Sequence, residues 1–166
     1  MVASLSKMPD HARLWVYQAN RQLINDELEV VASALEEFLK QWAAHGQELK
    51  AGYEVLYDQM IVMAVDESFA GASGCSIDSS VSVLRALGEE LGVSFLDRSQ
   101  IAFLKGDQIE MHALSSLKAE VESGNITTDM KIFNNAVTTL GDWKNAWLQS
   151  AGDSWMKRYF AKIEQV

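Results

Sequence analysis

The clearest structural signal in the chain is the apolar run Met60-Ile61-Val62-Met63-Ala64-Val65, which ends at Asp66 and Glu67. A run of this length without a polar residue predicts a strand that is buried on both faces. In open sheets, ligands most often bind at the carboxyl end of such strands. We therefore expect a functional site in segment 66–80, directly after the strand.

Segment 66–80 is rich in small and hydroxyl-bearing side chains and leads into a predicted helix. Ile77, Val81, Leu84 and Leu91 recur at the spacing of one helical stripe, and Gly92 can end the helix. The first turns of this helix therefore overlap the expected site. The residues that we expect to contact a ligand there are Ser73, Gly74, Cys75, Ser76, Asp78, Ser79 and Ser80.

The rest of the chain alternates predicted strands and helices. Upstream we expect a strand at 14–19 and a helix at 25–46, whose apolar stripe includes Val31, Leu35 and Leu39. We also expect a strand at 53–57 that forms a hairpin with the apolar run. Downstream we expect two strands, a short helix, a strand and a helical tail, at 98–104, 108–113, 114–124, 131–138 and from Trp143 onward. The order β-α-β-β-α-β-β-α-β-α predicts an α+β fold with a single mixed sheet of about six strands covered by helices.

Length, composition and charge narrow the class of protein. With 166 residues, of which 48% are hydrophobic, the chain is expected to form a single domain over 1–166. The net charge of -9 argues against a nucleic-acid binder, because such binding rests on Lys and Arg side chains that neutralise phosphates. The chain has neither a signal-peptide pattern nor an apolar run of about 20 residues, so we expect no membrane contact and a cytoplasmic location. The single cysteine, Cys75, agrees with a reducing compartment.

Five segments spread over nearly the whole chain carry a resemblance to a known family. They are residues 9–21, 64–68, 72–80, 96–98 and 133–135, and the part from Ser73 to Ser80 is the most specific. With these segments the chain resembles a small uncharacterised bacterial family whose members are often labelled "ABC transporter ATPase". The resemblance implies no established activity.

The residues do not contain the motif that the label "ABC transporter ATPase" requires. A phosphate loop needs G-x-x-x-x-G-K-[ST], because backbone amides and a lysine grip the phosphates. Gly71 and Gly74 are not followed by the Gly-Lys-Ser/Thr that would complete such a loop. We therefore reject nucleotide hydrolysis by a phosphate-loop ATPase.

One chemical interpretation of segment 66–80 is a site for a small anion. A helix N-terminus presents unpaired amides and the positive end of a dipole, and Ser73, Ser76, Ser79 and Ser80 add hydroxyl donors. A carboxylate or phosphate could be held there without a lysine. The competing interpretation is that Ser76 or Asp78 only caps the helix, which is the commoner use of such residues.

Two enzymatic interpretations of the same segment stay open. Cys75 at a helix N-terminus could act as a nucleophile, for which it needs a base among His11, His45 and His112. Alternatively, Asp66 and Asp78 could hold a divalent metal for a hydrolase. Asp66 and its neighbour Glu67 are poor co-ligands, since adjacent strand residues point to opposite faces.

Partner binding is the remaining interpretation, and it depends on the tryptophans. Trp143 and Trp147 lie one turn apart and form either a packed core, which is the commoner arrangement, or a recognition surface. Taken together, the residues predict a module that binds a small anion or a partner through segment 66–80, with an enzyme as the alternative. They assign no cofactor and no oligomeric state.

Overall fold

The computed structural model describes residues 4–42, 50–67 and 74–164, with side chains except at 74–78 and 162–164. The chain divides into two compact units. Unit 1 comprises Met1–Leu96 and Asn135–Asn145, and unit 2 comprises Asp97–Asn134 and Ala146–Val166. Each unit has its own hydrophobic core. A single domain over 1–166 stays a prediction.

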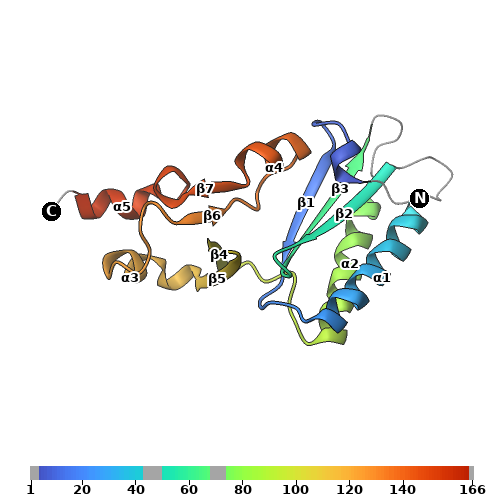
Figure 1. The fold of residues 1–166 in the computed structure, drawn as a ribbon, viewed down its shortest axis with the longest axis horizontal. Helices are drawn as coiled ribbons and strands as arrows, with labels where there is room; N and C mark the ends of the chain where they lie inside the picture. The colour runs from blue at the N-terminus through green and yellow to red at the C-terminus, as the bar shows by residue number, and fades with distance from the viewer. Residues whose placement is uncertain (1–3, 43–49, 68–73, 165–166) are drawn as a thin grey trace. The chain divides into compact units, whose positions relative to one another are not determined.

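Unit 1 is built on a three-stranded antiparallel sheet. Its strands are β1 (Arg13–Gln18), β2 (Lys50–Leu56) and β3 (Met60–Asp66), in the order β1-β3-β2 (Figure 1). Every residue of the central strand β3 is buried, which confirms the prediction made from the apolar run. The predicted hairpin is also confirmed, because β2 pairs with β3 across a turn in which Tyr57 and Asp58 have positive φ angles.

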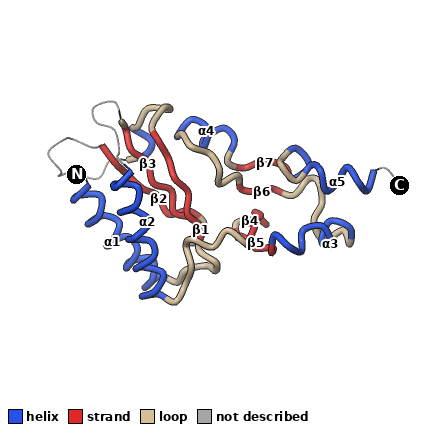
Figure 2. Tube along the Cα trace, turned by 180° about the vertical axis from the view of Figure 1, so that it is seen from behind, coloured by secondary structure: helices blue, strands red, loops and turns tan. Residues whose placement is uncertain are grey.

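Two long helices cover one face of this sheet. They are α1 (Asn25–Trp42) and α2 (Gly74–Leu91), which lie side by side in both views (Figures 1 and 2). Buried residues of α1 and α2 form one cluster with Ile61, Met63 and Val65 of β3. These three alternate along the strand with residues of the opposite face, as strand geometry requires. As predicted, α2 ends before Gly92, whose φ of +68° suits a glycine.

The turn after α2 approaches the helix very closely at Gly88. The Gly88 carbonyl accepts a hydrogen bond from the Val93 amide at 3.0 Å. A Cβ atom at position 88 would lie 2.6 Å from the Val93 carbonyl oxygen, so a side chain there would displace the backbone. The glycine therefore lets the chain fold back against the end of α2.

A second segment of unit 1 runs beside the start of β1. The Leu14 amide donates to the Thr138 carbonyl, and the Leu140 amide donates to the Ala12 carbonyl, each at 2.9 Å. The first helical element that the structure describes is a short 3₁₀ helix, η1 (Leu5–Lys7). α4 (Leu140–Ala146) begins directly after Thr139, which forms an isolated bridge with Arg13 at the start of β1. These bonds anchor residues from the last third of the sequence onto unit 1.

Unit 2 has a separate four-stranded antiparallel sheet in the order β5-β4-β6-β7. The strands are β4 (Gln100–Lys105), β5 (Gln108–Ala113), β6 (Lys131–Phe133) and β7 (Leu148–Ser150). The helical elements are η2 (Leu114–Ser116), α3 (Leu117–Glu122), η3 (Ala151–Asp153) and α5 (Lys157–Glu164). Phe103, Leu117, Ile126 and Ile132 lie fully buried in the core of this unit.

The prediction of a single mixed sheet of about six strands is wrong, although the α+β class is right. β3 has a partner on each edge, β1 and β2, and among the described residues the later strands pair only with one another. The predicted helical tail is interrupted by β7 and η3. Within the described ranges, no helix combines the length and the apolarity needed to cross a bilayer.

A bidentate ion pair joins the start of α1 to the end of α2. Arg21 Nη1 and Nη2 donate to Glu27 Oε1 and Oε2 at 2.8 and 2.7 Å, and Nη2 also donates to the Leu91 carbonyl at 3.1 Å. Glu27 Oε1 accepts the Ile24 amide at 3.0 Å, so the carboxylate also caps α1. The hydrogen bonds from Arg21, and then the one from the Ile24 amide, lower the pKa of Glu27 to about 2.

We expect Glu27→Gln to destabilise the protein at neutral pH and to have progressively less effect in acid. The pKa of Glu27 in the folded state lies below its ordinary value of 4.5, so the stabilisation is complete above that value and is lost as the pH falls toward 2. Unfolding midpoints of the two proteins, measured from neutral pH down to about pH 2, should therefore converge. Glu29→Gln on the same helix is the control, and a gap that does not change with pH would contradict the assignment.

Candidate functional site

The antiparallel sheet of unit 1 gathers charged residues at the carboxyl end of β3. Because both neighbouring strands run opposite to β3, their first residues lie beside its last ones. Arg13 of β1 is in register with Val65, and Lys50 of β2 is in register with Asp66. Asp66 and Lys50 therefore lie on the same face of the sheet.

Asp66 and His11 form a pair of a buried acid and an exposed base at this end of the sheet. His11 Nε2 lies 3.8 Å from Asp66 Oδ1, and the side chains are 68% and 8% exposed, respectively. The carboxylate is thus held inside the protein while the imidazole faces solvent. The solvent-facing member of this pair is therefore the basic one.

Arg13 and Glu67 form a second pair at the same end of the sheet. Arg13 Nη1 donates to Glu67 Oε1 at 3.4 Å, and its guanidinium lies 5.2 Å from the centroid of the Trp15 indole. The two side chains are 43% and 34% exposed. The indole and the carboxylate both contact the guanidinium, while part of it stays accessible.

The structure describes some of the predicted ligand-contacting residues with side chains and others only in part or not at all. Gly74, Cys75, Ser76 and Asp78 lie at the start of α2, although their side chains are outside the described part. Ser73 also lies outside the described residues.

Ser79 and Ser80 lie within α2, past the four N-terminal amides that a helix leaves unpaired. Ser79 is exposed, whereas Ser80 is fully buried, and its Oγ lies 3.3 Å from Tyr17 Oη of β1. Ser80 therefore helps to pack α2 onto the sheet.

The histidines that could have served Cys75 have different surroundings. His11 lies beside Asp66, whereas His112 Nε2 lies 2.9 Å from Glu110 Oε1 and its ring packs edge-on against Phe103 in unit 2. His45 lies outside the described residues. His112 is thus a packed and paired residue of the unit 2 sheet.

The tryptophans also separate into packed and exposed members. Trp147 is 6% exposed and packs against Phe133 with ring centroids 4.8 Å apart, so it belongs to the interior. Trp143 is half-buried. Trp155 is 43% exposed and meets Tyr159 edge-on. If a tryptophan contacts a partner, Trp155 is the accessible one.

Sequence reasoning named His11 only as a candidate base for Cys75, and it did not include Arg13 or Lys50 in the site at the end of β3. All three residues lie just before or at the start of a strand. That position points to the site only once it is known that β1 and β2 pair with β3 in antiparallel fashion. In the part of the chain that the structure describes, no group of three or more His, Cys, Asp and Glu residues could hold a metal ion. No protein-family model, curated protein or solved structure matches the chain.

Proposed function

We propose that the chain is a binding module for a small ligand that carries a carboxylate or a phosphate, with its site at the carboxyl end of β3. The observation that carries the proposal is the layered arrangement of charge at this end of the sheet. The acids are the more buried partners and the bases are the more exposed ones: Asp66 lies behind His11, and Glu67 beside Arg13. The accessible part of the site is therefore its basic part, in a chain whose net charge is -9.

Two further features suit an anion at this place. Lys50 is exposed and lies on the Asp66 face of the sheet, whereas Arg13, in register with Val65, lies on the opposite face, so basic side chains border the end of the sheet from both sides. α2 begins on the same end of unit 1 as the last residues of β3 (Figure 1), so its N-terminal dipole is directed toward this end. A planar carboxylate matches the fork of the Arg13 guanidinium, and the imidazole of His11 supplies one more donor.

The test is a thermal-shift titration of the full chain with inorganic phosphate and with citrate at constant ionic strength. An anion present at 100 times its Kd should raise the free energy of unfolding by ~2.7 kcal/mol. Arg13→Gln and His11→Gln should each weaken the anion about tenfold or more, because each removes a charge-assisted hydrogen bond.

Lys40→Gln, an exposed change near the end of α1, provides a charge-matched control and should leave the titration unchanged. A shift that survives both site variants would contradict the proposal, as would the absence of any shift with either anion. A parallel titration with Mg²⁺ and Mn²⁺ on Asp66→Asn tests the metal alternative. Stabilisation by a metal that is lost in this variant would favour a hydrolase instead.

A further inference from the structure

Unit 2 contains a groove between α3 and α5, two helices that lie side by side in both views (Figures 1 and 2). Its volume is about 210 Å³, and it is lined by Lys118, Glu122, Arg158 and Tyr159. Small-molecule sites usually enclose roughly 300–1,000 Å³, so a groove of this size suits one or two side chains of a larger partner.

The charges of the groove differ from those of the chain as a whole. Unit 1 carries fifteen acidic and seven basic residues, whereas unit 2 carries eight and seven. Lys118 projects into the groove from α3 and Arg158 from α5. Among the described side chains, no carboxylate lies within ion-pair distance of either one, although carboxylates pair with Arg21, Lys105 and Lys144 elsewhere. Both cations are exposed and available to an anionic partner.

One of these cations, Arg158, contacts an aromatic ring. The Arg158 guanidinium lies 5.0 Å from the centroid of the Tyr159 ring, and Nη2 donates to Tyr159 Oη at 3.3 Å. Trp155 meets Tyr159 edge-on at 6.3 Å and exposes 43% of its surface. Trp, Tyr and Arg are the residues that most often dominate the binding energy of protein interfaces. A guanidinium stacked on a ring still presents its edge to a carboxylate.

We propose that this groove docks an acidic peptide segment of a partner protein. A carboxylate of the peptide pairs with Arg158 and Lys118, and an adjacent apolar side chain packs on Trp155 and Tyr159. Glu122 lies one turn along α3 from Lys118 and disfavours an acid directly beside it. This interaction uses other residues than the anion site of unit 1 and is independent of it.

The experiment is a titration of the full chain with fluorescein-labelled hexaglutamate, followed by fluorescence anisotropy. Hexaglutamine serves as the uncharged probe. We expect hexaglutamate to bind at least tenfold more tightly than hexaglutamine, and we expect Arg158→Gln and Lys118→Gln each to weaken it about tenfold. Raising the salt concentration should weaken the complex as well.

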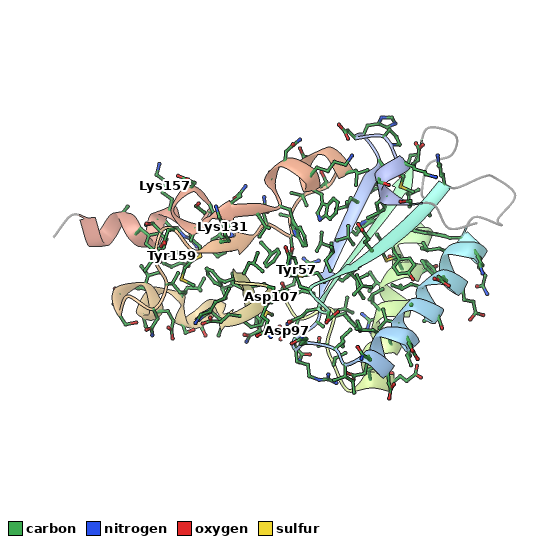
Figure 3. The ribbon with its side chains drawn as sticks, viewed as in Figure 1. Tyr57, Asp97, Asp107, Lys131, Lys157 and Tyr159 are labelled. Carbon is green, nitrogen blue, oxygen red and sulfur yellow. The ribbon has the colours of Figure 1, made fainter. Side chains whose placement is uncertain are left out.

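Lys157→Gln is the matched control, because Lys157 is exposed on α5 but points away from Tyr159 (Figure 3). It should change the affinity less than twofold. Equal losses in Lys157→Gln and Arg158→Gln would overturn the proposal, since they indicate diffuse attraction without a groove. It would also be overturned if both hexapeptides bound equally, or if free citrate competed as effectively as unlabelled hexaglutamate, which would indicate a small-anion site.

Discussion

Replacing Phe103 with alanine should lower the free energy of unfolding of unit 2 by about 3–5 kcal/mol. Phe103 lies in β4, in register with Ile132 of β6, and its side chain is fully buried. Its ring also meets the His112 ring edge-on with centroids 5.2 Å apart. Truncation removes the largest apolar side chain in the centre of this core and leaves a cavity that the sheet and helices fill only partly.

Amide hydrogen exchange measured at β4 and β6 resolves this effect in unit 2 alone. A loss of 3–5 kcal/mol corresponds to exchange roughly a hundredfold or more faster for amides that open only in global unfolding. Phe103→Leu should show a smaller loss because it keeps most of the volume. Leu114→Ala is the surface control, since Leu114 is 44% exposed. If Phe103→Ala loses less than about 1 kcal/mol, the packing described for this core is wrong.

Replacing Leu35 with alanine should destabilise unit 1 by about 2–5 kcal/mol. Leu35 lies in the middle of α1 and is fully buried, with Val31 and Leu39 one turn away on the same stripe. The three belong to the cluster that also contains Ile61 and Met63 of β3. The loss combines the hydrophobic transfer of the missing methyl and methylene groups with the cavity that they leave.

Urea unfolding followed by circular dichroism measures the Leu35 effect. Alanine has a high helix propensity, so a loss on Leu35→Ala reports packing and not the helical tendency of α1. Glu37→Ala, an exposed position on the same helix, should change the free energy of unfolding by less than about 0.5 kcal/mol. Leu35→Met should be milder than Leu35→Ala because it conserves volume. Similar losses in Glu37→Ala and Leu35→Ala would contradict the assigned face of α1.

The periodicity of the sequence was enough to predict several elements of unit 1. The apolar run 60–65 forms the buried central strand, and the stripe through Val31, Leu35 and Leu39 forms the buried side of α1. Gly92 ends α2, because positive φ suits a residue without a Cβ. In each of these cases the cause is local: side-chain spacing or backbone sterics acting within a few residues.

The division into two sheets and the composition of the site could not be predicted in the same way. β-Sheet hydrogen bonds join backbone groups that every residue carries, so a strand's own sequence does not name its partner. β1 was therefore predicted as a strand, but its place beside β3 was not. The grouping of His11, Arg13 and Lys50 with Asp66 depends entirely on that place.

The sequence by itself determined the long helices and the central strand of unit 1 and which of their faces are apolar, because both follow from the order of side chains along the chain. It also determined that a phosphate loop is absent, since that motif is contiguous. The tertiary structure decided that the strands form two sheets, and that the exposed His11 lies beside the buried Asp66 at the end of β3. The reason is physical: contacts between residues distant in sequence depend on chain topology, whereas secondary structure depends mainly on neighbours.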